Sequence, residues 1–172
     1  MPFFVVIASL IKITSQGNVL HVSKRIGKNG KLFFMPKFRT MVENTPLMPP
    51  YYLKNPEQYY TNFGRILRRY YLDELPQLFT ILTGEMSFVG PRPGLAKNED
   101  DLIEKRKIEK IEILTPGLTG WAQIKADGNA PIDKKVNWDK YYLKHRSFWF
   151  DIKIMLLTAY VMLINPKKRK IY

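Results

Sequence analysis

The chain has 172 residues, a length that suits one domain with a substantial core and is short for two. Its 28 Lys and Arg against 15 Asp and Glu give a formal charge of +13, which favours anionic partners such as nucleic acid, nucleotide phosphates or an acidic membrane surface. The absence of cysteine excludes disulfides, thiol nucleophiles and Cys-based zinc sites, and 45% hydrophobic residues exclude a disordered chain. Only two histidines, His21 and His145, are present, which disfavours His-ligated metal chemistry.

The chain begins with an apolar run, Met1 to Ile13, in which the only charge is at Lys12. A helix that spans a bilayer needs about 20 apolar residues, so this run is too short to cross a membrane by itself. A buried core helix or strand is the simpler interpretation. The alternative is a segment that enters the membrane only partway.

An Asn-Gly pair at 29–30 lies between two β-prone runs, and this pattern predicts a β-hairpin over about residues 18–41 because both turn positions need a positive φ. In the second strand, Lys37 and Arg39 are two residues apart and are predicted to share one side. Either a solvated face or a phosphate-facing ridge is consistent with this placement.

The segment 41–60 is rich in proline and tyrosine and is predicted to be a loop. Gly64 is predicted to open a short basic helix after it. Three arginines, Arg65, Arg68 and Arg69, have the spacing that places them on one face of this helix.

Two adjacent carboxylates, Asp73 and Glu74, follow these arginines and precede an apolar helix that Gly84 is predicted to end. Asp73 is well placed as the helix N-cap, and a purely structural role for the pair is one interpretation. The other is that carboxylates and arginines concentrated in a basic protein hold a metal ion and phosphates together.

Arg92 stands between Pro91 and Pro93, whose fixed φ angles predict a rigid turn. Such a turn presents a guanidinium to a phosphate at little cost in conformational entropy. The next segment, 98–114, is predicted to be an amphipathic helix with ion pairs one turn apart, and no chemistry is assigned to it. Residues 118–124 are predicted to form a short strand or loop beside the site.

A second apolar run, Phe148 to Ile164, carries Asp151 and Thr158, which form a polar stripe with Asn165 just after the run, and a basic cluster at 167–170 follows. Aromatic residues at its start and the basic cluster at its end are typical of a helix that lies on a bilayer surface. A core helix with a solvated tail is the alternative.

Four segments carry a resemblance to a known family. They read KRIGKNGKLFFMPKFRTM, LRRYYLDELPQLFTILTGEMSFVGPRP, TPGLTGWAQI and SFWFDIKIMLLT, in this order along nearly the whole chain. They resemble the bacterial sugar transferase family, the monotopic phosphoglycosyl transferases that start cell-surface polysaccharide, exopolysaccharide or lipopolysaccharide assembly on undecaprenyl phosphate.

The resemblance implies that a sugar-1-phosphate passes from a UDP-sugar to undecaprenyl phosphate, with release of UMP. It implies that Asp73 is the nucleophile of a covalent phospho-sugar intermediate and a Mg²⁺ ligand, and that Glu74 positions or activates the lipid phosphate. The phosphates are expected to be held by a set of residues from the hairpin, the basic helix and the proline turn: Lys37, Arg39, Arg68, Pro91, Arg92 and Pro93. Asp139 and Asp151 occupy two later acidic positions of the family.

The resemblance also implies a location, the cytoplasmic face of the bacterial inner membrane. Family members usually have a longer N-terminal membrane hairpin, of which this sequence, from Met1-Pro2, is expected to hold the returning half. Tyr71 replaces a more frequent serine, and residues 125–127 replace a usual Gly-Arg-Asn stretch, differences that bear on sugar specificity.

The expected fold is α+β, a single sugar transferase domain over 1–172. It consists of a partial re-entrant membrane helix (1–16), a helix-rich catalytic core with the β-hairpin (17–147), and a C-terminal interfacial helix with a basic tail (148–172). Two other functions are weighed against it, a catalytically inactive membrane-surface scaffold and a basic nucleic-acid-binding module. The dispersed basic residues argue against nucleic acid as a partner.

Overall fold

A computed structural model describes residues 2–46, 53–97, 99–126 and 130–164. The fold mixes helices and strands, 55% and 16% of the described residues, and this confirms the α+β class. Its contacts divide the chain into two compact units. Unit 1 comprises Met1–Ser23 and Met35–Leu78, and unit 2 comprises Lys24–Phe34 and Phe79–Tyr172.

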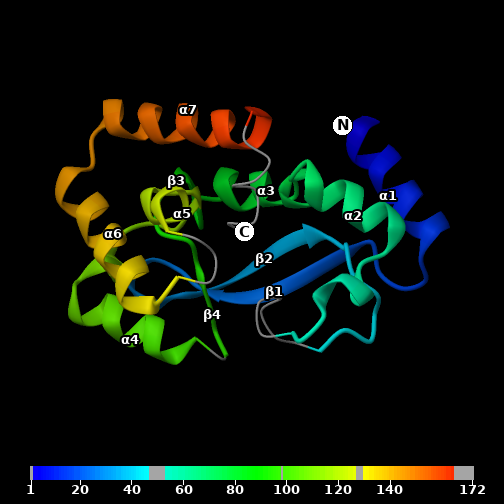
Figure 1. Ribbon diagram of the computed structural model, residues 1–172, viewed down its shortest axis with the longest axis horizontal. Helices are drawn as coiled ribbons and strands as arrows, with labels where there is room; N and C mark the ends of the chain where they lie inside the picture. The colour runs from blue at the N-terminus through cyan, green and yellow to red at the C-terminus, as the bar shows by residue number, and fades with distance from the viewer. Residues whose placement is uncertain (1, 47–52, 98, 127–129, 165–172) are drawn as a thin grey trace. The chain divides into compact units, whose positions relative to one another are not determined.

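In unit 1, α1 (Pro2–Thr14) lies beside α2 (Asn62–Arg69), as Figure 1 shows. The apolar spacing of α1 places Ile7 and Ile11 on one face, and this face packs on Phe38 and Leu67 to form the core of the unit. Two short 3-10 helices complete it, η3 (Pro56–Tyr59) and η4 (Leu72–Glu74).

The predicted hairpin is confirmed. Its strands are β1 (Leu20–Ile26) and β2 (Leu32–Phe38), and the turn η1 (Lys28–Gly30) joins them. Asn29 and Gly30 both have a positive φ, 55° and 75°, as this turn requires. The end of β1 also pairs antiparallel with β4 (Gly94–Leu95), which gives a sheet of order β2-β1-β4.

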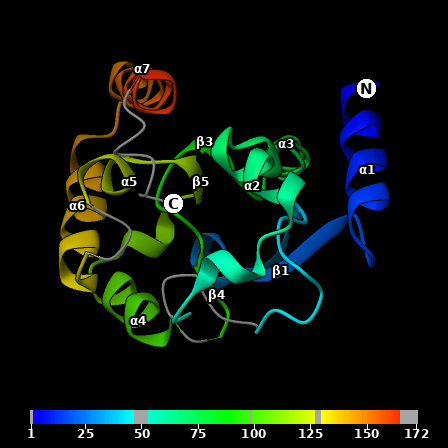
Figure 2. The same ribbon diagram turned by 45° about the vertical axis from the view of Figure 1, so that its right-hand side comes forward.

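In unit 2, a small parallel sheet of β3 (Ser87–Val89) and β5 (Gly117–Thr119) contacts α7 (Phe148–Ile164). Around it lie α4 (Asp100–Ile108), α5 (Trp121–Lys125) and α6 (Ile132–His145), and α4 and α6 run side by side (Figure 2). A cluster of buried apolar side chains forms the core of this unit: Val89, Leu102, Ile111, Leu114, Trp121, Val136, Tyr142 and Ile154.

Three predicted helix boundaries are wrong. The basic helix α2 begins at Asn62, two residues before Gly64, because the hydroxyl of Thr61 caps it by accepting from Gly64 N. Asp73 lies inside η4 and is not the N-cap of α3 (Gln77–Leu82), which ends before Gly84 as predicted. The helix expected over 98–114 stops at Ile108, and Lys110, with φ 56°, leads into the short turn η5 (Ile111–Ile113).

Helix α7 has the predicted bounds, and two of its polar side chains, Asp151 and Thr158, bond to other elements of unit 2, whereas Lys153 is exposed. The hydroxyl of Thr158 lies 2.7 Å from that of Thr119, and Asp151 accepts a hydrogen bond from Tyr142 at 2.7 Å. Large apolar side chains are exposed on the other side: Phe148, Trp149, Leu156, Tyr160 and Leu163.

Helix α1 likewise exposes part of its apolar surface, because only one of its faces packs on the core. Phe3, Val5 and Ile13 are all more than half exposed. Among the described residues, no helix has the length and apolar content needed to cross a bilayer. Asn165, the basic segment 167–170 and Asp127 lie outside the described residues.

Candidate active site

The acidic pair of unit 1 is buried in a tight turn. Asp73 and Glu74 are 6% and 7% exposed. Tyr71 adopts a left-handed backbone conformation, φ 56°, and directs the chain from the end of α2 into η4. The leucines on either side of the pair, Leu72 and Leu75, pack against the core of the unit, so apolar contacts anchor the turn that carries both carboxylates.

Glu74 is paired with a cation from the hairpin. The ammonium nitrogen of Lys37 lies 2.5 Å from Glu74 Oε1, and both side chains are largely shielded from solvent. A charge-assisted hydrogen bond in such surroundings is much stronger than at the surface. The contact fixes the Glu74 carboxylate and brings Lys37, a predicted phosphate ligand, to the acidic pair.

Asp73 has an unusual affinity for protons. Burial raises the pKa of its carboxyl from 3.8 to about 6, because desolvation penalises the charged form more than the nearby cations favour it. Lys37 and Arg68 lower this pKa, and the neighbouring carboxylate of Glu74 raises it. Near neutral pH the side chain is therefore a desolvated carboxylate, a good nucleophile for a partner that brings compensating interactions.

Arg68 is held over an aromatic ring. Its guanidinium carbon lies 5.1 Å from the centroid of the Tyr60 ring, within the range of a cation–π contact. Tyr60 is half-buried, and desolvation, with a contribution from Asp73, raises the pKa of its hydroxyl. Tyr60 ends the segment 41–60 that is predicted to be a loop, a prediction that is wrong at η3 (Pro56–Tyr59). No local pattern predicts that Tyr60 lies near Arg68 and Asp73.

Arg39 has a different partner from Lys37. Its Nη2 atom donates to the carbonyl oxygen and hydroxyl of Ser15, just beyond α1, at 3.0 and 2.8 Å. The side chain is only 7% exposed, and Gly17 leaves room for it, since a Cβ there would lie 2.1 Å from Arg39 Nη1. The expected common ridge of Lys37 and Arg39 is wrong, because Arg39 follows the last residue of β2 and turns to α1.

In unit 2, three successive carbonyl groups fix the turn that carries Arg92. The carbonyl of Pro91 accepts from Gly117 N at 2.9 Å, that of Arg92 from Arg106 Nη1 at 2.7 Å, and that of Pro93 from Arg25 Nη1 at 3.2 Å. The two prolines also fix φ on either side. The turn is thus restrained by tertiary contacts as well as by its prolines, and its rigidity stays a prediction.

The segment 115–124 packs against this turn through glycines. A Cβ on Gly117 would lie 2.1 Å from Gly90 N, and a Cβ on Gly120 would lie 2.1 Å from Gly90 O. Only hydrogen fits at such backbone separations. The expected strand or loop at 118–124 is right for its first part, which belongs to β5, and wrong for the rest, because Trp121–Lys125 forms the helix α5.

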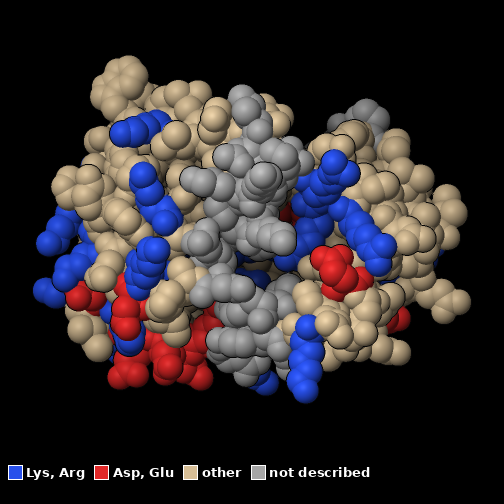
Figure 3. All heavy atoms as spheres, viewed as in Figure 1, with Lys and Arg blue, Asp and Glu red and all other residues tan. Residues whose placement is uncertain are grey.

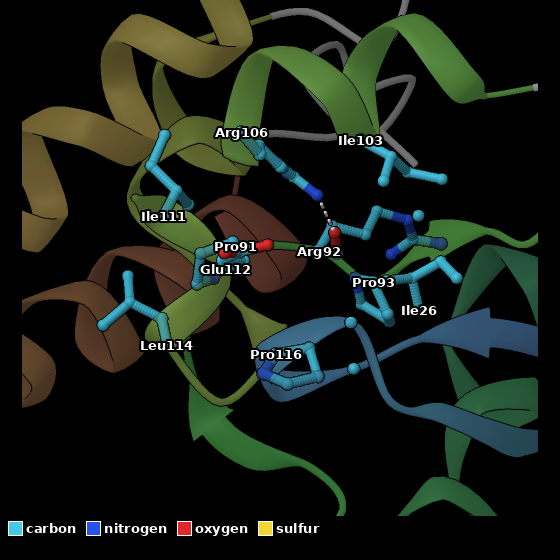
Figure 4. A pocket seen from close by; sticks show the side chains of 13 residues that line it. Ile26, Pro91, Arg92, Pro93, Ile103, Arg106, Ile111, Glu112, Leu114 and Pro116 are labelled. Atoms are coloured by element: carbon cyan, nitrogen blue, oxygen red, sulfur yellow. Dashed lines mark hydrogen bonds between the residues drawn. The ribbon is translucent and has the colours of Figure 1, made fainter. Parts of the chain in front are cut away.

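The two later acidic positions of the family have partners within unit 2. Asp139, 1% exposed, accepts from Arg106 Nε and Nη2 at 2.9 and 2.6 Å. Burial raises the pKa of Asp139 and the Arg106 charge opposes this rise. Asp151 accepts from Tyr142 and joins α7 to α6. Figure 4 shows Arg106 directed at the Arg92 carbonyl, whereas the Arg92 side chain extends away from it.

Residues 1–165 match the family described as bacterial sugar transferase. The chain belongs to the bacterial sugar transferase family. The sequence resemblance is thereby confirmed over nearly the whole chain.

Three curated relatives illustrate the similarity. The UDP-glucose:undecaprenyl-phosphate glucose-1-phosphate transferase of Escherichia coli K12 is 39% identical over 175 residues, covering 95% of this chain and 37% of the relative. The UDP-N-acetylgalactosamine-undecaprenyl-phosphate N-acetylgalactosaminephosphotransferase of Aeromonas hydrophila is 33% identical over 94% of this chain and 39% of the relative. The exopolysaccharide production protein ExoY of Rhizobium meliloti is 34% identical over 91% of this chain and 75% of the relative. This sugar transferase chain thus spans less than two fifths of the first two proteins.

The structure of this sugar transferase gathers the predicted residues in two places. Lys37, Arg68, Asp73 and Glu74 come together in unit 1, and the Arg92 turn and Asp139 come together in unit 2. On the face shown in Figure 3, carboxylates gather over the region of α4 and basic side chains spread over other parts of unit 2.

Sequence reasoning missed two further cations near Arg92. Arg106 lies in the segment to which no chemistry was assigned. Lys135 lies on α6, and burial, together with the charges of Arg106 and Arg92, lowers its pKa. Neither Arg106 nor Lys135 is close to Arg92 in sequence, so no local motif predicts that they lie near it.

Proposed function

We propose that this bacterial sugar transferase chain transfers a sugar-1-phosphate from a UDP-sugar to undecaprenyl phosphate through a covalent intermediate on Asp73. The observation that carries the proposal is the buried Asp73–Glu74 pair, with Lys37 at 2.5 Å from Glu74 and the pKa of Asp73 at about 6. The relatives support the reaction class, because two of them are named as undecaprenyl-phosphate sugar-phosphate transferases acting on UDP-sugars.

In the first step, a carboxylate oxygen of Asp73 attacks the phosphorus that bears the sugar. A new O–P bond forms, the bond between this phosphorus and the bridging oxygen of the diphosphate breaks, and UMP leaves. Cations are needed for this approach of an anion to an anion, and Lys37 and Arg68 lower the pKa of Asp73 from within unit 1.

In the second step, a phosphate oxygen of undecaprenyl phosphate attacks the same phosphorus. The Asp73 carboxylate is released, and undecaprenyl diphosphate sugar is formed. Glu74 is the residue to position or activate the incoming lipid phosphate, since the Lys37 ammonium fixes its carboxylate beside the nucleophile. Arg92, on its restrained turn, is a further phosphate ligand.

The acidic pair has the chemistry of a Mg²⁺ site. Mg²⁺ prefers one or two carboxylates together with substrate phosphates and water, and Asp73 and Glu74 offer such hard oxygen ligands. No group of three or more His, Asp or Glu side chains suited to a metal is present among the described residues. Mg²⁺ bound at Asp73 would neutralise charge on the diphosphate.

The lipid substrate requires a membrane surface, and the exposed side of α7 supports one. Trp149 is 78% exposed, Leu156 67% and Leu163 77%, on a helix whose opposite side carries Asp151 and Thr158 bonded within unit 2. Aromatic and aliphatic side chains presented in this way suit the interface of a bilayer, and α1 exposes a comparable surface. The cytoplasmic face of the inner membrane is the proposed location, where nucleotide sugars are available.

The proposal is tested by intact-protein mass after incubation with Mg²⁺ and a panel of UDP-sugars, without lipid. A mass gain of one phospho-sugar and release of UMP are expected, and both should be absent in Asp73→Asn. Asp100→Asn, an exposed aspartate of α4, is the matched control and should form the adduct normally. Addition of undecaprenyl phosphate should then discharge the adduct.

Two results would contradict the proposal. An adduct that persists in Asp73→Asn would exclude this residue as the nucleophile. A failure to release UMP from every donor, even with undecaprenyl phosphate present, would favour the inactive membrane-surface scaffold.

A further inference from the structure

Arg106 forms hydrogen bonds both to the Arg92 turn and to a fully buried carboxylate, that of Asp139. Its Nε and Nη2 atoms donate to Asp139 Oδ2, and its Nη1 atom donates to the Arg92 carbonyl at 2.7 Å. Asp139 thereby fixes the plane of the guanidinium, and this plane directs the remaining nitrogen at the turn (Figure 4).

The Arg106–Asp139 ion pair is not the sole contact between the two helices on which it lies, as the described residues show. Arg106 belongs to α4 and Asp139 to α6, and Lys105 of α4 also pairs with Asp133 of α6 at 2.5 Å. Burying a charged pair costs desolvation that apolar side chains of similar volume would avoid. Arg106–Asp139 differs from the surface pair in its burial and in its bond to the turn.

We infer that Arg106, held by Asp139, is a positioning residue that fixes Arg92 for phosphate binding. The inference rests on the proposed function, in which Arg92 is a phosphate ligand. A guanidinium must be held within a fraction of an ångström to give a bidentate phosphate contact. The position of the Arg92 backbone determines where its guanidinium can lie. Proline rings fix two φ angles of the turn, and Arg106 fixes the carbonyl between them.

The test uses the double variant Arg106→Met/Asp139→Leu. It removes both charges together, so no buried charge is left without its partner, and the fold should persist, as thermal unfolding would show. In the wild-type background, the kcat/KM for UMP release from the UDP-sugar should fall about 10-fold or more. In an Arg92→Ala background, the same two substitutions should change this rate by less than about 2-fold, because the side chain they position is gone.

The matched control is Lys105→Met/Asp133→Leu, which removes the exposed ion pair between the same two helices. It should leave UMP release within about 2-fold of the wild type. If Arg106→Met/Asp139→Leu lowered the rate of UMP release equally with and without the Arg92 side chain, the inference would be overturned. The ion pair would then act on the stability of the fold and not on Arg92.

A second readout does not depend on catalysis. Hydrogen exchange of the Gly117 amide, which donates to the Pro91 carbonyl of the turn at 2.9 Å, should become about 10-fold faster in Arg106→Met/Asp139→Leu and remain unchanged in the surface control. If the wild type releases no UMP from any donor, the proposed function fails, and the exchange rate still decides whether Arg106 holds the turn. Unchanged exchange in the double variant would refute the positioning role.

Discussion

Lys37 Nζ lies 2.5 Å from Glu74 Oε1, so the hairpin supplies the direct cationic partner of the second carboxylate in the acidic pair. Asp73, one residue earlier, is influenced by the same ammonium but keeps a pKa of about 6 because desolvation dominates. Two neighbouring carboxylates thus have different environments, which suits them to different roles in one reaction.

Removal of Lys37 should destabilise the fold. Lys37→Met takes the ammonium from a largely buried pair, and we expect the free energy of unfolding to fall by about 2–4 kcal/mol in urea titrations at pH 7.5. Lys37→Met/Glu74→Gln, which removes both charges, should recover much of the loss. A double variant no more stable than Lys37→Met would show that the pair is not the source of the effect.

The rate of adduct formation should depend on the ionisation of Asp73. With a pKa of about 6, the single-turnover rate is expected to rise about tenfold per pH unit below this value and to level off above it. Glu74→Gln removes a like charge and should move the midpoint down. Lys37→Met removes an opposite charge and should move it up; shifts in the reverse directions would contradict the assignment.

The same pKa makes a prediction for stability. Because Asp73 binds its proton more tightly in the folded protein than in the unfolded chain, stability should decline as the pH rises from about 4 through about 6. Asp73→Asn removes this penalty, and its free energy of unfolding at pH 7.5 should exceed that of the wild type by about 1–3 kcal/mol. Asp100→Asn, at an exposed position, should show no gain.

The exposed side of α7 should govern membrane binding. Trp149→Gln and Leu156→Gln are each expected to lower the fraction bound to anionic vesicles about 3- to 10-fold, because each removes apolar surface from the interface. Thermal unfolding should be unchanged, since both side chains are mostly exposed. Ile108→Gln on α4, 72% exposed, is the control for loss of an exposed apolar group elsewhere.

The glycine contact between β5 and the Arg92 turn should tolerate no side chain. Gly117→Ala would place a Cβ 2.1 Å from Gly90 N and 2.4 Å from Thr119 O, and these backbone atoms cannot move aside as a flexible side chain can. We expect a loss of at least about 2–3 kcal/mol in the free energy of unfolding. Gly30→Ala, where nothing lies within 4 Å of a Cβ but φ is +75°, should cost only the backbone strain of about 1 kcal/mol.

Local patterns predicted the elements whose causes are local. The Asn29-Gly30 pair requires its two positive φ angles wherever the hairpin lies, and the apolar run 148–164 is a helix with the predicted ends. Gly84 ends α3 for the same kind of reason, a left-handed φ of 78°. By contrast, α2 begins after Thr61 and not at Gly64, because the Thr61 hydroxyl caps the helix by accepting from the Gly64 amide.

The sequence by itself determined the α+β class, the hairpin, the last helix and the motif residues Lys37, Arg68, Asp73 and Arg92, because turn chemistry and family motifs are written in neighbouring positions. Only the tertiary structure decided which of them meet. Lys37 and Glu74 are 37 positions apart, and Arg106 and Asp139 are 33 apart, so no local pattern connects them. Asp151 and Thr158 of α7 point inward for the same reason: Thr119 and Tyr142, their partners, come from other elements, and burial of the partners' hydroxyl groups requires hydrogen bonds there.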